Sequence, residues 1–157
     1  KTQDIRLKGE EYLTFEVQPF LRVELDDTPM ISDGVITARV KVDRGVSKDD
    51  FKKVLAQTGD YSDSYLNMTD IQLFVSYSSS CGYRARDERW SNEILYSGKA
   101  FETQFGKTIT ITSNPKNPIP SGRKVFIRAA ARINYDTPAG SGTRRWNYSE
   151  VVEVDIP

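Results

Sequence analysis

The sequence predicts an all-β fold, an antiparallel β-sandwich with one short helical insertion near residues 47–58. Two patterns predict it: short segments in which apolar and polar residues alternate, and clusters of turn-forming residues between those segments. The chain has 157 residues, 38% of them hydrophobic, and is therefore long enough to bury a core as one domain. Several short strands at this spacing are typical of a sandwich.

Strand signals begin near the N-terminus. Residues 12–17 and 20–25 predict one interrupted edge strand, because Pro19 between them lacks the backbone donor that a ladder needs. Residues 35–42 carry apolar side chains at every second position, which is the period of a half-buried strand. The same alternation recurs over 71–77, 108–112 and 125–133, and a last strand is predicted over 151–156. Turn clusters separate the strands at 32–34, 78–82, 114–122 and 137–142.

One segment has helical periodicity instead. Ser47 is a predicted N-cap, Asp50 follows three positions later, and Gly59 is a predicted terminator. Phe51 and the apolar residues one turn further on share a face. The polar stretch 60–70 that follows predicts a long loop.

Charge and composition exclude several classes of function. Lys and Arg number 22, as do Asp and Glu, and this neutral balance disfavours nucleic acid as a partner, since that affinity needs many cations. The chain has no His and one Cys, so it lacks the commonest general base and metal ligand. Composition therefore disfavours an enzyme and implies no cofactor. No apolar run approaches the roughly 20 residues that span a bilayer.

Short motifs with catalytic or metal-binding counterparts are rejected on context. Ser121 and Lys124 match a Ser-x-x-Lys nucleophile signature but precede a strand, where positions three apart point to opposite faces. Asp26, Asp33 and Asp63 lie in acidic turns without the spacing of a Ca²⁺ loop. Cys81 follows a strand, and with no His to activate it an inert thiol is expected. A carboxylate pair for glycoside hydrolysis stays open as an alternative.

The candidate ligand-binding residues are aromatic and cationic, and they form two patches. The first patch comprises Tyr83, Arg84, Arg86, Arg89 and Trp90, and the second comprises Arg144, Arg145, Trp146 and Tyr148. Flat rings flanked by planar polar groups suit sugars, because a ring covers the apolar face of a pyranose while the polar groups bond its hydroxyls. The alternative is structural, with the rings capping the core and the arginines stacked on them.

The C-terminal third resembles a known sandwich type. Residues 122–134 and 146–157 are similar to the final two strands of fibronectin type III-like sandwiches, and residues 71–79 are similar to the central strand. The resemblance implies an immunoglobulin or fibronectin III-like arrangement of the predicted strands.

The N-terminal segment 11–23 carries a narrower resemblance. It resembles the start of the C-terminal domain in a Bacteroidetes surface-lipoprotein family of unknown function, of the DUF3823 type, in which Asn-Tyr-Ser near the end, here 147–149, also occurs. The resemblance implies that residues 1–19 are a lead-in strand or linker from a missing N-terminal domain and that 20–157 are the sandwich. It also implies an exported protein at the cell surface or the periplasmic face of the outer membrane, with a lipid anchor outside this fragment.

Two non-catalytic functions remain open at this point. The first is a non-catalytic module accessory to glycan capture or uptake, with a glycan or outer-membrane uptake proteins as partners. The alternative is a structural spacer or protein-docking domain that binds no small ligand. The family resemblance supplies no catalytic residues.

Overall fold

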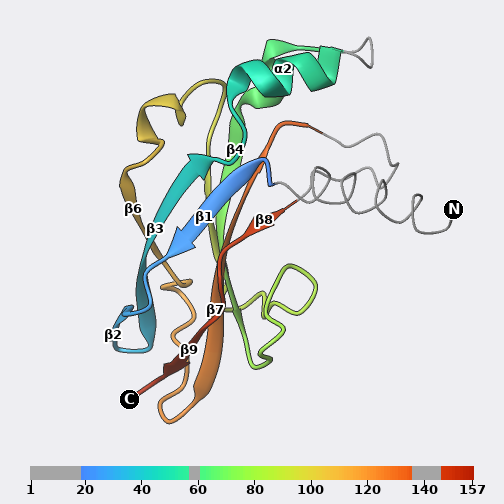
Figure 1. Ribbon diagram of the computed structural model, residues 1–157. Coiled ribbons are helices and arrows are strands. Elements are labelled where there is room, and N and C mark those ends of the chain that lie inside the picture. Colours follow the sequence, from blue (N-terminus) through green and yellow to red (C-terminus); the bar gives the residue numbers. More distant parts are fainter. Residues whose placement is uncertain (1–18, 57–60, 136–145) are drawn as a thin grey trace, which may run out of the picture.

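Two antiparallel sheets pack face to face in the computed structural model, which describes residues 19–56, 61–135 and 146–157 (Figure 1). The first sheet contains β1 (Leu21–Leu25), β2 (Met30–Ser32), β3 (Val35–Arg44) and β6 (Thr108–Thr112). The second contains β4 (Met68–Ser76), β5 (Asn92–Leu95), β7 (Lys124–Ile133), β8 (Asn147–Tyr148) and β9 (Val152–Asp155). The predicted all-β sandwich is confirmed. No helix among the described residues is long and apolar enough to cross a membrane.

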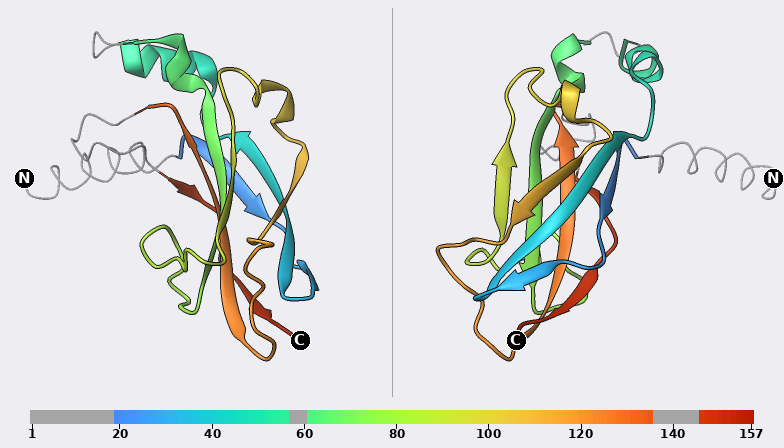
Figure 2. Two further views of the ribbon diagram at one scale, coloured as in Figure 1. Left: turned by 180° about the vertical axis from the view of Figure 1, so that it is seen from behind. Right: turned by 90° about the vertical axis from the view of Figure 1, so that its left-hand side faces the viewer.

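Each sheet is built around long strands that pair on both sides. β3 pairs with β6 on one side and with β1 and β2 on the other, while the second sheet runs in the order β5, β4, β7, β8. β9 also pairs with β7, further along the same edge as β8. The right-hand view of Figure 2 shows the two layers, with β3 and β6 in front of β4 and β7. The last strand, predicted over 151–156, is confirmed as β9.

The alternation of apolar residues predicts the core correctly. Ile36, Ala38, Val40 and Val42 on β3 are fully buried, and so are the inward residues of β4 and β7. Tyr77, which the alternation placed on the same face as Ile71, follows the end of β4 and is 46% exposed.

The predicted helix is present as α2 (Lys48–Ala56). The Ser47 hydroxyl accepts the Asp50 N–H at 3.2 Å, which confirms the N-cap, and Phe51 is buried against the core. Gly59, the predicted terminator, lies outside the described residues. The predicted long loop over 60–70 is wrong, because it contains the 3-10 turn η1 (Asp63–Leu66) and the start of β4 at Met68. The pairing of β4 with β7 shifts register between Met68 and Asp70, and this shift interrupts the alternation of apolar and polar residues at the start of β4.

Four further short elements carry no periodic signal and were not predicted: β2, β5, β8 and the 3-10 turn η2 (Glu102–Gln104). β2 pairs with β3 through a tight turn at Asp33 and Gly34, whose φ values of 51° and 77° suit an Asp-Gly hairpin. The strand predicted over 12–17 and the turn over 137–142 lie outside the described residues.

Candidate ligand-binding site

The outer face of the β5–β4–β7–β8 sheet holds a second apolar cluster, separate from the core. Phe74 on β4 and Ala130 on β7 point away from the inner face, yet both are fully buried. They are covered by the loop that follows β4 and by the segment around β8, which Figure 1 shows on the side of the sandwich away from β3 and β6. An apolar side chain on the outside of a sheet has to be covered in this way to leave water.

Four rings form what we call the aromatic cluster: Phe74, Tyr83, Trp146 and Tyr148. The Tyr83 and Trp146 rings stack with centroids 5.8 Å apart and planes inclined by 28°. Phe74 meets the Trp146 ring edge to face at 5.5 Å, and it also contacts both tyrosine rings. The Tyr83 backbone N–H donates to the Tyr148 hydroxyl at 3.2 Å, which ties the loop to β8.

The chain holds the Tyr83 loop at both ends. Cys81 is buried beneath it, and its thiol donates to the Phe74 carbonyl at 3.4 Å. At the other end Trp90 is 3% exposed and packs in the main core, where its ring meets Tyr77 at 5.1 Å. The backbone N–H of Asp87 donates to the Val75 carbonyl at 2.7 Å.

On the other side, the Asn-Tyr-Ser segment turns Tyr148 outward. Asn147 is buried, accepting the Leu21 N–H at 3.3 Å and donating to the Ala131 carbonyl at 3.4 Å, so it links β8 to the opposite sheet. Ser149 is buried too, and its hydroxyl accepts the Ala129 N–H at 3.0 Å. Alternation along the strand leaves Tyr148 facing solvent.

Three guanidinium groups lie over the rings of the cluster. Arg86 lies 4.0 Å from the Tyr83 centroid, Arg128 lies 4.4 Å from that of Tyr148, and Arg132 lies 3.9 Å from that of Trp146. Their charges are balanced differently. Arg86 pairs with Glu88 at 2.9 Å, Arg132 pairs with the buried Asp70 at 2.9 Å, and Arg128 donates to the backbone carbonyls of Ser149 and Cys81.

Exposure separates the supporting rings from those that a ligand can reach. Tyr83 is 45% exposed and Tyr148 is 37% exposed, whereas Trp146 is half-buried and Phe74 is buried. The tyrosine rings are therefore the accessible surface, with Phe74 in contact with both of them and Trp146 stacked against Tyr83.

The structure brings part of the two predicted patches together and places Trp90 and Arg89 elsewhere. Tyr83, Arg86, Trp146 and Tyr148 come together, and Arg84 is exposed on the same loop. The interpretation of Trp90 as a stacking ring is not supported, because a side chain 3% exposed offers no face to a sugar. Arg89 lies over Trp90 at 4.6 Å and pairs with Asp87 at 2.8 Å, away from the cluster. Arg144 and Arg145 lie outside the described residues.

Sequence reasoning missed Phe74, Arg128 and Arg132. The signal was present in the outward positions of two predicted strands, where Phe74 interrupts a polar series on β4 and arginines flank Ala130 on β7. Those positions become informative only once another segment is known to cover them.

The remaining chemistry of the described residues is limited. Burial raises the pKa of the Cys81 thiol to about 11, with Arg128 opposing, so the group is a thiol at neutral pH, as expected for an inert cysteine. No group of three or more Cys, Asp or Glu able to hold a metal ion occurs among them.

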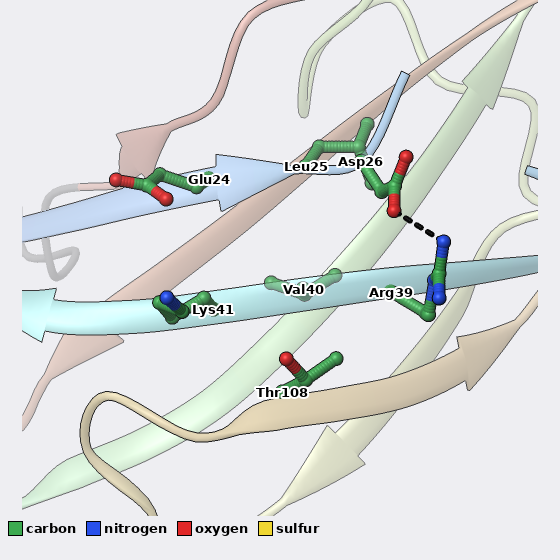
Figure 3. Close-up of a pocket in the computed structure, with 7 residues that line it drawn as sticks. All are labelled: Glu24, Leu25, Asp26, Arg39, Val40, Lys41 and Thr108. Carbon is green, nitrogen blue, oxygen red and sulfur yellow. Dashed lines mark hydrogen bonds and ion pairs between the residues drawn. The ribbon is translucent and has the colours of Figure 1, made fainter. Parts of the chain in front are cut away.

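A hollow of about 200 Å³ lies on the other sheet, below the usual size of a ligand pocket (Figure 3). Its side chains come from three segments, with Glu24 on β1, Lys41 on β3 and Thr108 on β6. An ion pair between Asp26 and Arg39 occupies one end of it. The aromatic cluster is the better candidate because two of its aromatic side chains, Tyr83 and Tyr148, are exposed.

The fold and the cluster define a two-sheet β-sandwich domain with an aromatic and arginine-rich outer surface. No family model and no curated protein sequence matches the chain. Among solved structures, a DUF3823 family protein from Bacteroides uniformis matches with 63% identity and a TM-score of 0.85, covering 89% of this chain and 57% of its own. The chain therefore belongs to the DUF3823 family, whose function is unknown, and the predicted resemblance is confirmed.

More distant structures share the fold. A DUF3823 family protein from Bacteroides ovatus has 12% identity and a TM-score of 0.54, with 89% of this chain and 57% of its own covered. A protein from Bacteroides uniformis described as a candidate carbohydrate-binding protein has 16% identity and a TM-score of 0.55, with 88% and 58% covered. None of these relatives is described as an enzyme. The chain spans little more than half the length of each.

Proposed function

We propose that this domain is a non-catalytic glycan-binding module of an exported bacterial surface lipoprotein, and that its binding site is the aromatic cluster. The observation that carries the proposal is the meeting of Tyr83 and Tyr148, two exposed rings 65 positions apart in the sequence, on one buried platform. A fixed pair of partly exposed tyrosines with guanidinium donors beside them suits a sugar, whose apolar C–H groups contact the exposed parts of the rings while its hydroxyls accept hydrogen bonds.

The comparisons support the proposal at the level of architecture. The same fold occurs in a Bacteroides uniformis protein described as a candidate carbohydrate-binding protein, and at 16% identity that likeness concerns the fold alone. The outer-membrane location rests on the family resemblance in the sequence. A lipid-attachment cysteine behind a signal peptide in the full-length precursor would support that location, and a precursor without one would contradict it.

A protein-docking role is the second candidate, and one observation favours it. β5 ends its sheet among the described residues, and Leu95 on it is 70% exposed. An open strand edge with an apolar side chain can pair with another chain. This role predicts no retention by polysaccharides.

Affinity electrophoresis in gels containing a panel of polysaccharides tests the proposed function. Wild-type protein should be retarded by at least one of them, and Tyr83→Ala should weaken that retention by about tenfold or more, because it removes an exposed ring of the cluster. Tyr77→Ala is the matched control, since Tyr77 is 46% exposed but lies outside the cluster.

Melting temperatures of both variants show whether each still folds. Equal retention of wild type and a folded Tyr83→Ala variant would contradict the assignment of the site. A wild-type protein that no polysaccharide retards would favour the docking role.

A further inference from the structure

The charges around the aromatic cluster are not balanced. Arg86 and Arg132 each pair with a carboxylate, Glu88 and Asp70 respectively. Arg128 has no carboxylate within ion-pair distance among residues 19–56, 61–135 and 146–157, and Arg84 beside Tyr83 is exposed. The cluster therefore carries local positive charge on a chain whose formal net charge is zero.

Arg128 is held in place without being neutralised. Its Nε donates to the Ser149 carbonyl at 2.7 Å, and its Nη1 donates to the Cys81 carbonyl at 3.3 Å. A guanidinium has five N–H donors, so these two bonds leave donors on both terminal nitrogens. The two terminal nitrogens form the fork that binds a planar or tetrahedral anion through two hydrogen bonds.

The surroundings of Arg128 strengthen such an interaction. The side chain is half-buried, and its guanidinium lies over the exposed Tyr148 ring. A cation that is partly removed from water attracts an anion more strongly than a fully exposed one. The carbonyls of Ser149 and Cys81 also fix its orientation, so little side-chain entropy is lost when a ligand binds.

We infer that the ligand of this site is an anionic saccharide, one bearing a uronic acid carboxylate or a sulfate ester. This inference rests on the proposed glycan-binding function and names its ligand class. The anionic group binds Arg128, with Arg84 nearby on the same loop as Tyr83, and the sugar ring packs against Tyr148 and Tyr83.

Two pairs of polymers that differ only in charge test the ligand class. Binding of the full chain to dextran sulfate is compared with dextran, and binding to polygalacturonic acid with its fully methyl-esterified form. At least one anionic polymer should bind about tenfold more tightly than its neutral partner, and the difference should shrink as salt is added. The pair that shows the difference distinguishes sulfate from carboxylate.

The other possible results of the polymer comparison would contradict the inference. If the neutral polymers bind as tightly as the anionic ones, the anionic class is wrong and the glycan-binding function stands. If none of the four polymers binds, the anionic class is overturned, and the polysaccharide panel in affinity electrophoresis separately decides the proposed function.

Substitutions of single arginines test which guanidinium group binds the anionic group of the saccharide. Arg128→Gln should weaken binding of the preferred anionic polymer by about tenfold, and Arg128→Lys should recover part of that loss because it keeps the charge without the fork. Arg22→Gln is the matched control, removing the same charge from an exposed position on β1 of the other sheet. Equal losses in Arg22→Gln and Arg128→Gln would overturn the inference.

A second variant covers the case in which Arg128→Gln unfolds the protein. Arg84→Gln removes an exposed guanidinium from the same loop and should leave the melting temperature unchanged. It should weaken binding of the anionic polymer several-fold relative to Arg22→Gln, and an Arg84→Gln variant that binds like Arg22→Gln would contradict the inference.

Discussion

Trp90 and Trp146 have similar local sequences and opposite roles. Each has an arginine guanidinium over its ring, Arg89 at 4.6 Å and Arg132 at 3.9 Å. Trp90 is buried in the main core, whereas Trp146 is half-buried on the outer face of the sheet, stacked with Tyr83. The sequence predicted both as candidate stacking rings because an aromatic residue beside an arginine looks the same in either setting. Burial separates them, and burial depends on the packing of two sheets.

The core position of Trp90 gives a prediction about stability. Trp90→Ala should lower the free energy of unfolding by about 3–5 kcal/mol, the usual cost of removing a large buried ring. Urea unfolding followed by circular dichroism measures the change. A loss below about 1 kcal/mol would show that the ring is not part of the core.

At the scale of elements, long strands were predictable and short ones were not. β3, β4 and β7 carry alternating apolar residues at four, three and five successive positions respectively, which is a clear signal of a half-buried strand. β2, β5 and β8 have two to four residues each, too few for a period to show. Their positions are set by pairing with longer neighbours, which local sequence does not describe.

The candidate site was likewise predictable only in part. Its exposed rings stand out in the sequence as aromatic and arginine-rich patches, so Tyr83 and Tyr148 were predictable as residues. Their meeting over Phe74 was not, because it depends on how the loop after β4 folds back against β8.

One set of charges joins three elements at the end of the sandwich near α2. Glu102 in η2 accepts from Arg44 on β3 at 2.9 Å and from Lys48 on α2 at 2.6 Å. Burial acts to raise the pKa of Glu102, but the Lys48 hydrogen bond and the Arg44 charge outweigh it, so the pKa lies below its ordinary value of 4.5. A lowered pKa in the folded state means that this contribution to stability is present above the unfolded pKa and lost as pH falls through the folded pKa.

Glu102→Gln tests this network. At pH 7 the free energy of unfolding of the variant should be about 1 kcal/mol lower than that of wild type. The loss is small because the ion pairs of Glu102 are partly solvated. Below pH 4.5 the gap should narrow as the wild-type carboxylate becomes protonated. Urea midpoints from pH 7 to pH 3 provide the measurement, and a gap that stays constant over that range would contradict the assignment.

For the whole molecule, the two faces of the sandwich differ in what they offer a partner. The outer face of the first sheet holds a small hollow with an internal ion pair, whereas that of the second holds two exposed tyrosines and a guanidinium without a carboxylate among the described residues. The zero formal charge of the chain conceals this asymmetry. The chain also spans 57% of the length of its 63%-identical relative.

The most direct test of the glycan site uses the two tryptophans of the chain as separate reporters. Trp90→Phe leaves Trp146 in the cluster as the sole tryptophan, and Trp146→Phe leaves Trp90 in the core. Each variant is titrated with the polysaccharide that retards wild-type protein most, and tryptophan emission is recorded. Ligand at the aromatic cluster should shift or quench the emission of Trp146 and leave that of Trp90 unchanged. A response from Trp90 alone, or saturable binding with no response from Trp146, would contradict the site.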